Sequence, residues 1–113
     1  MHVYEAEGYR TFVRHCLEHG TPARPRSTKK LLADHLRVHA TFVSHVVAEK
    51  ADFSSEQAVR FCDFYGMDPA STDYFIDLLG RDRAGDVPTR ELFSQRLDRQ
   101  RDAWLTLQNR LKD

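Results

Sequence analysis

The amino-acid sequence predicts an all-α protein with a single core. Apolar side chains recur at helical spacing along most of the chain, and Gly or Pro separates one such stretch from the next. The chain has 113 residues, of which 41% are hydrophobic, which suffices for one packed domain but not for two. Because no apolar run approaches about 18 residues and the first residues lack the pattern of a signal peptide, we expect a cytoplasmic protein without a membrane span.

The first half of the chain is expected to form three helices. The first has one apolar stripe, which ends at Gly20 and consists of Tyr9, Phe12, Val13, Cys16 and Leu17. After a loop at 21–26, Ser27 or Thr28 can cap a second helix that carries Leu31, Leu32 and Leu36. Residues 37–39 interrupt the pattern, and a third, short helix carries Phe42, Val43, Val46 and Val47. Because valine is β-branched, residues 46–47 would also suit a strand.

Two further helices are expected before residue 81. Ser54, with Gln57 three residues later, is typical of a capping box and opens a helix that ends at Gly66. The pair Asp68-Pro69 begins the next helix, because Pro at the first helical position needs no amide partner. Its apolar stripe continues until Gly80, where we expect it to end. Residues 1–80 thus form one five-helix domain.

A polar linker over residues 81–88 and one helix of about seven turns over residues 89–113 are expected to complete the chain. Six side chains of this helix occupy the seam positions of successive heptads, namely Phe93, Leu97, Gln100, Trp104, Leu107 and Leu111. Such a seam can pair with a second copy, with Gln100 fixing the register, or pack on the protein's own core. We expect a mixture, with the proximal end intramolecular and the distal end forming a homodimer.

Charge is balanced overall but unevenly spread. Seventeen Lys and Arg balance seventeen Asp and Glu, which excludes a globally basic protein that coats DNA by charge alone. Residues 24–50 nevertheless hold six basic and two acidic side chains, whereas residues 51–80 hold one basic and six acidic side chains. Such asymmetry can orient a small domain on a polyanion, although oppositely charged faces also simply solvate a fold. The acidic side chains Asp63, Asp68, Asp73 and Asp77 are expected to form a solvated face or a partner surface.

The second and third expected helices have the spacing of a helix-turn-helix. Ala33 is small where the two helices would cross, and Val38, Val43 and Val46 would point inward. A crossing of about 90–120° through a three- or four-residue turn needs a small contact residue, and it leaves the second helix free to enter a DNA major groove. The pattern by itself is weak, because any two short amphipathic helices can produce it.

Four blocks of the sequence resemble a known family. The blocks are residues 8–13 (GYRTFV), 40–44 (ATFVS), 53–56 (FSSE) and 73–79 (DYFIDLL). They are similar to a poorly characterised family of bacterial helix-turn-helix proteins thought to be transcription regulators, and residues 32–67 resemble the Cro and phage-repressor type of domain. The resemblance covers residues 3–101. It implies an all-α, repressor-like, five-helix DNA-binding domain, followed in longer relatives by a second region.

The resemblance also implies which positions read bases. They are Ala40, Thr41, Ser44 and His45. None is an Arg, Asn or Gln, whose bidentate base contacts are worth about 1–3 kcal/mol each, so we expect modest sequence discrimination. Thr41 and Ser44 can bond a phosphate or a base, and Ala40 can touch a thymine methyl. Because histidine gains charge as the pH falls, His45 predicts pH-dependent binding.

Basic side chains flank the third expected helix where backbone phosphates would lie. The candidate phosphate contacts are Arg24, Arg26, Lys29, Lys30, His39 and Lys50. They could equally be solvated residues of an ordinary surface. In the turn, this chain has Arg37 where such domains usually have Gly. A left-handed backbone there would cost about 1 kcal/mol or more, so the turn could be reshaped.

The remaining residues point to no catalytic or metal chemistry. Cys16 and Cys62 lack a paired-ligand spacing and are expected to be reduced core residues. His15 and His19 could share a metal, but no further ligand is evident. Because no catalytic triad, phosphate loop or carboxylate pair stands out, we expect no enzyme, cofactor or metal site.

The sequence therefore predicts a transcription regulator that docks a helix-turn-helix on double-stranded DNA as a homodimer. Dimerisation would suit paired half-sites about one helical turn apart. Such a cytoplasmic protein would be associated with the nucleoid. The alternative is an adaptor whose helix-turn-helix no longer reads DNA and which binds another protein through the acidic 52–77 face or the terminal helix.

Overall fold

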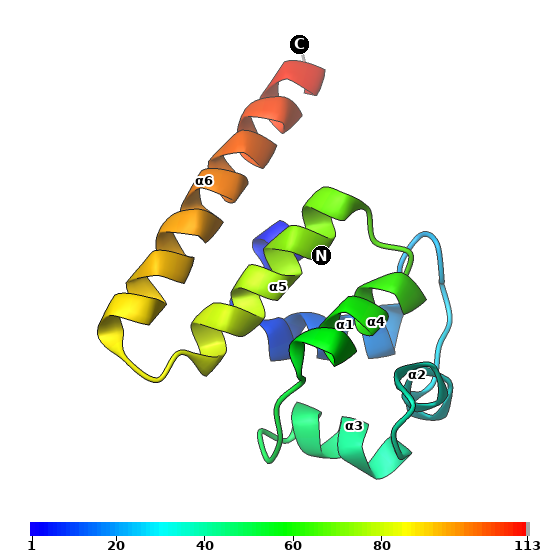
Figure 1. Cartoon of the computed structure of the whole chain (residues 1–113). Coiled ribbons are helices and arrows are strands. Elements are labelled where there is room, and N and C mark those ends of the chain that lie inside the picture. Colours follow the sequence, from blue (N-terminus) through cyan, green and yellow to red (C-terminus); the bar gives the residue numbers. More distant parts are fainter. Residues whose placement is uncertain (113) are drawn as a thin grey trace.

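Helices are the only regular secondary structure in residues 1–112, which confirms the predicted all-α class. A computed structural model describes residues 1–112. After a short 3₁₀ helix, η1 (Val3–Glu5), six α-helices follow in order: α1 (Tyr9–His19), α2 (Lys29–Leu36), α3 (Ala40–Val47), α4 (Ser55–Phe64), α5 (Pro69–Arg83) and α6 (Val87–Lys112) (Figure 1). Residues 1–112 contain no strand, so residues 46–47 are helical. Residue 113, the end of the predicted terminal helix, lies outside the described residues.

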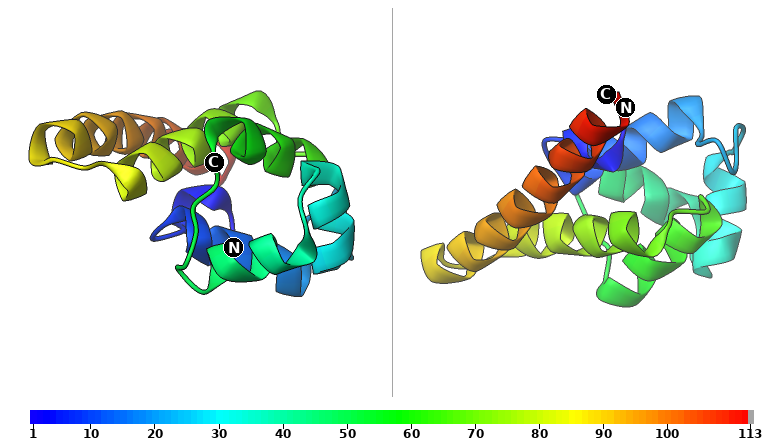
Figure 2. Two further views of the ribbon diagram at one scale, coloured as in Figure 1. Left: turned by 60° about the horizontal axis from the view of Figure 1, so that its bottom comes forward. Right: turned by 90° about the horizontal axis from the view of Figure 1, so that it is seen from above.

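The terminal helix and the pair of short helices lie in different parts of the molecule. α6 runs along one side of α5, whereas α2 and α3 lie at the other end of the molecule (Figures 1 and 2). Within the described part of the chain, no helix is both long and apolar enough to cross a membrane.

An aromatic cluster joins α1, α4 and α5 at the centre of the fold. Phe61 stacks on Phe75 with ring centroids 4.9 Å apart, and Phe12 approaches both rings. α2 and α3 attach to this core through four buried side chains, which are Leu32, Leu36, Val43 and Val46. As predicted, Cys16 and Cys62 are free thiols inside the core. Burial raises the pKa of each thiol to about 12.

Side-chain caps begin three helices where the sequence predicts them. Thr28, one of the two predicted candidates, accepts a hydrogen bond from a first-turn amide of α2 at 3.1 Å. Ser54 and Gln57 form the predicted capping box of α4. Asp68 accepts a hydrogen bond from a first-turn amide of α5 at 2.8 Å. These bonds satisfy amides that have no partner within their own helix, so they fix where each helix begins.

The predicted end of a helix at Gly80 is wrong. α5 continues through Gly80, and residues 84–86 alone separate it from α6, where a linker over 81–88 was expected. Gly80 makes room for a neighbouring helix, because a Cβ there would lie 2.4 Å from the ring of Phe93. α6 begins before residue 89 because Asp86 accepts a hydrogen bond from a first-turn amide at 2.8 Å.

Asp77 is buried between α5 and α6, so the expectation that it belongs to a solvated acidic face is wrong. Its side chain is 5% exposed and pairs with Arg96 at 3.2 Å. Gln100 donates a hydrogen bond to the same carboxylate at 2.7 Å. Asp63, another member of the expected face, pairs with a histidine of α2 at 3.0 Å, and Asp68 caps α5. Of the expected acidic face, Asp77 alone is buried, and its other members remain exposed.

Four of the six predicted seam residues of α6 contact the protein's own chain, and these are Phe93, Leu97, Gln100 and Trp104. Trp104 stacks on Tyr4 of η1 with ring centroids 5.1 Å apart. Leu107 and Leu111 are 52% and 74% exposed. Because Gln100 is occupied by an internal partner, it is not free for the expected role of fixing the register of a helix pair.

Candidate nucleic-acid interface

α2 and α3 form a helix pair joined by three residues, 37–39. Arg37 has φ 62° and ψ 42°, which is the left-handed conformation. This conformation is costly for arginine because its Cβ crowds the backbone. The turn is therefore not reshaped to avoid it. The amide of Val38 donates to the carbonyl of Ala33 at 3.0 Å and closes the end of α2. Ala33 is 1% exposed, as expected for a small residue where two helices meet.

The outer face of α3 is open to solvent. Ala40, Thr41 and His45 are exposed and Ser44 is half-buried, whereas Val43 and Val46 on the inner face are fully buried. Within residues 1–112, the side chains of Thr41, Ser44 and His45 form no hydrogen bond. The structure thus brings the four predicted base-reading residues to one face, and its polar groups are free for a ligand.

The N-terminal end of α3 is also open. His39 is the N-cap residue and supplies no side-chain hydrogen bond to the first turn. The unpaired amides and the helix dipole therefore leave this end partially positive. An anion such as a phosphate would be stabilised there.

Two arginines of α1 hold the opposite, C-terminal end of α3. Arg10 donates from Nε to the carbonyl of Val46 at 2.9 Å, and Arg14 donates to the carbonyl of Val47 at 2.6 Å. These carbonyls form the negative end of the helix dipole, so the two guanidinium groups satisfy and neutralise it. α3 is thereby fixed on α1 without using its outer face.

The segment that follows α3 is fixed by the same part of α1. Arg10 donates to the carbonyl of Ala51 at 3.0 Å and pairs with Asp52 at 2.6 Å. Tyr9 donates its hydroxyl hydrogen to Asp52 at 2.7 Å, and burial, together with this bond, raises the pKa of Tyr9. Glu49 closes α3 with φ 64°, a second left-handed residue at the helix pair. The C-terminal end of α3 is therefore fixed both directly and through the segment that follows it.

Five of the six predicted phosphate contacts are exposed, and they are Arg26, Lys29, Lys30, His39 and Lys50. The sixth, Arg24, is half-buried because its guanidinium lies 4.0 Å from the ring centroid of Phe64 and its Nε donates to the Phe64 carbonyl at 2.6 Å. Arg24 therefore attaches the loop before α2 to the end of α4. Its expected role at a phosphate finds no support in this position.

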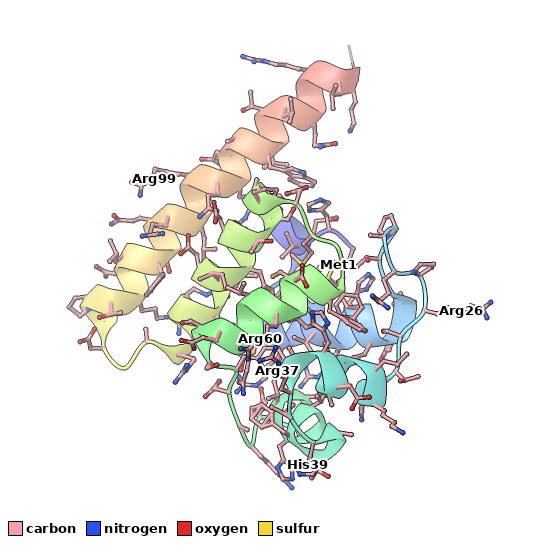
Figure 3. The ribbon with its side chains drawn as sticks, turned by 45° about the vertical axis from the view of Figure 1, so that its right-hand side comes forward. Met1, Arg26, Arg37, His39, Arg60 and Arg99 are labelled. Carbon is pink, nitrogen blue, oxygen red and sulfur yellow. The ribbon has the colours of Figure 1, made fainter. Side chains whose placement is uncertain are left out.

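The exposed basic residues surround the helix pair. Lys29 and Lys30 lie in the first turn of α2, and Lys50 follows the end of α3. Figure 3 shows Arg37 and His39 at the end of the molecule formed by the helix pair, and Arg26 pointing outward from the loop before α2. Arg37, which the sequence reasoning left out of the phosphate set, is exposed and forms no ion pair within residues 1–112.

The roles of Arg10 and Arg14 could not be found from the sequence. Their spacing of four places them on one face of α1, but nothing in the pattern says that this face meets the end of α3. The described residues also contain no cluster of three or more His, Cys, Asp or Glu that could hold a metal ion. His15 and His19 do lie together, with ring centroids 4.8 Å apart.

Comparisons with known proteins identify no relative: no family model, curated protein or solved structure matches the chain. The structure shows an all-α domain in which two short helices, α2 and α3, are joined by three residues and the outer face of α3 is exposed. The function is therefore argued from the chemistry of α3 and its surroundings.

Proposed function

We propose that the protein binds double-stranded DNA by docking α3 in the major groove, and that it regulates transcription from the sites it occupies. The observation that carries this proposal is the contrast between the two sides of α3. Its inner face and C-terminal end are fixed by the core and by Arg10 and Arg14, whereas its outer face and N-terminal end are free. A recognition helix must be held rigidly while it protrudes.

Charge around the helix pair supports the same proposal. Lys29 and Lys30 lie in the first turn of α2, and Lys50 lies just beyond α3. Phosphates on the two edges of a groove would lie at such flanking positions. The outer face itself offers two hydroxyl groups and an imidazole, which supports modest rather than stringent discrimination among sequences.

The test is fluorescence anisotropy of labelled duplexes, selected from a random-sequence pool, at several salt concentrations. Wild-type affinity should fall steeply as salt rises, because each neutralised phosphate releases a counterion. Lys29→Glu/Lys30→Glu should weaken binding at least about tenfold and reduce the salt slope by about 2, one unit per lost phosphate contact.

A charge-matched control separates this contact from a general effect of net charge. Arg90 and Arg99 are exposed on α6, away from the helix pair. Arg90→Glu/Arg99→Glu changes the total charge by the same amount and should leave the affinity within about twofold of wild type, since screening limits charge effects beyond about 10 Å. Equal losses in the two variants would contradict a local contact at α2.

A folded protein that binds no duplex at low salt would contradict the proposal. That result would favour the adaptor, in which the same helix pair packs normally but contacts no DNA. The homodimer is also part of the proposal, because two weakly binding domains joined together bind paired half-sites of DNA more tightly than either domain alone.

A further inference from the structure

A groove lies between α5, α6 and the N-terminal segment, away from the helix pair. It has a volume of about 760 Å³. Apolar and aromatic side chains form part of its wall, including Ile76, Trp104 and Leu107. Two carboxylates, Asp68 and Asp73, are exposed at the same groove. An apolar groove with an acidic edge is suited to an apolar helix that carries basic residues.

The last turns of α6 have this character themselves. α6 has 26 residues and packs against α5, which has 15, so its C-terminal turns extend past the start of α5 (Figure 1). Leu107 and Leu111 lie one turn apart and are 52% and 74% exposed. Arg110 and Lys112 are exposed beside them and form no ion pair within residues 1–112.

We propose that the end of α6 occupies the groove of a second copy of this chain, and that the second copy does the same in return. The proposal develops the homodimer of the proposed function but needs no DNA. Leu111 of each copy packs on the apolar wall of the other groove, and Lys112 faces the other copy's Asp73, while Arg110 adds to the positive charge of the same helix end. Because each copy gives a basic helix end and receives one, the contact closes with two-fold symmetry.

Helix geometry is consistent with this exchange. If two copies of α6 cross in antiparallel orientation between Leu107 and Gln108, residue 111 of one copy aligns with residue 104 of the other. Trp104 is part of the groove wall, so Leu111 reaches the apolar surface that it needs. Residue 112 then aligns with Ala103, which lines the same groove as Asp73, whereas residue 110 aligns with residue 105 on the other side of Trp104. A parallel heptad pairing gains nothing from Gln100, since Asp77 already binds it.

A charge exchange tests the proposal by sedimentation equilibrium of the full chain without DNA. Wild type should have twice the mass of one chain. Asp73→Arg places a cation in the groove opposite a basic helix end, and Arg110→Glu/Lys112→Glu places an acidic helix end opposite Asp73, so each variant alone should be monomeric. Mixed in equal amounts, they should form a heterodimer, because each groove then meets a helix end of opposite charge. Asp68 is left unchanged because it caps α5.

A pair of leucine variants provides the matched control. Leu92 and Leu107 are both on α6 and are 54% and 52% exposed. Leu107→Ser should raise the dimer dissociation constant at least about tenfold, as expected for losing one buried leucine side chain, whereas Leu92→Ser should leave it unchanged. Circular dichroism checks that each variant is folded.

Three results would overturn this contact. The first is a wild type that stays monomeric at about 100 μM, where a micromolar contact would be nearly saturated. The second is a mixture of the two charge variants that stays monomeric. The third is a dimer that Leu92→Ser disrupts as strongly as Leu107→Ser. DNA binding is measured separately, so failure of the dimer and failure of the proposed function remain distinguishable.

Discussion

Arg10 of α1 donates from Nε to the carbonyl of Val46 at 2.9 Å, and this bond ties the start of the chain to the C-terminal end of α3. The same guanidinium reaches Ala51 and Asp52, beyond the end of that helix. α3 therefore depends on a residue 36 positions earlier in the chain for its orientation. If α3 reads DNA, Arg10 positions it without touching the DNA.

Arg10→Ala should lower the free energy of unfolding by about 1–2 kcal/mol, because charge-assisted hydrogen bonds to two carbonyls are lost from a partly exposed site. Duplex affinity should fall as α3 becomes less well fixed, while the salt slope stays the same. Urea unfolding and anisotropy titrations measure the two effects. A salt slope smaller by about 1 would instead show that Arg10 contacts a phosphate.

Arg37→Gly should stabilise the protein by about 0.5–1 kcal/mol, because glycine adopts the left-handed conformation without a Cβ penalty. Glu49→Gly should act in the same direction, since its φ is 64°. Arg60→Gly is the control, because Arg60 lies inside α4, where glycine costs about 1 kcal/mol. Thermal unfolding should therefore show a higher melting temperature for Arg37→Gly and Glu49→Gly and a lower one for Arg60→Gly. A loss of stability in Arg37→Gly would show that contacts of its side chain outweigh the strain.

Asp77→Ala should destabilise the protein by about 1–3 kcal/mol, because it removes the buried partner of Arg96 and Gln100. The loss is limited because the Arg96 side chain is half exposed and can turn to water. Asp73→Ala, at an exposed carboxylate of the same helix, should change stability by less than about 0.5 kcal/mol. Denaturant titrations of the two variants at low protein concentration make the comparison, and equal losses would argue against the buried pair.

Cys16 and Cys62 should resist alkylation in the folded protein at pH 8 and react once it is unfolded. Burial raises the pKa of both thiols from 9.0 to about 12, so the reactive thiolate is scarce. Mass spectrometry after iodoacetamide treatment, with and without urea, measures this. Labelling of both thiols at equal rates in the two states would contradict their burial.

The same pKa shift makes stability fall in alkaline solution. Above pH 9 the thiols ionise in the unfolded chain but not in the folded one, so their contribution is complete below pH 9 and declines as the pH rises towards 12. Cys16→Ala/Cys62→Ala should show a weaker decline between pH 9 and pH 10. An identical decline in wild type and variant would assign it to other groups.

Local chemistry explains what could be predicted from the sequence. Thr28, Ser54 and Asp68 each accept from the amide three residues later, so the starts of α2, α4 and α5 follow from nearby residues. The inner face of α3 was equally predictable, because Val43 and Val46 keep helical spacing.

Contacts between distant segments explain what could not be predicted. Gly80 looks like a helix end in the sequence, but its missing Cβ accommodates Phe93 of another helix. The sequence suggests that Asp77 is solvated, but α6 covers it. The sequence also suggests that Arg24 is free, but its guanidinium lies over the ring of Phe64. Arg10 was missed for the same reason, since its partners lie on a different helix and the loop after it.

One comparison tests the role of α3 most directly. Thr41 and Thr89 are both exposed threonines in the first turn of a helix, but Thr41 lies on the outer face of α3 and Thr89 on α6. A glutamate at either position suits the helix dipole equally, so both variants should fold. With duplex DNA at low salt, Thr41→Glu should abolish the salt-sensitive anisotropy signal, while Thr89→Glu keeps wild-type affinity. Equal affinity in Thr41→Glu and Thr89→Glu would contradict docking of α3 in the groove.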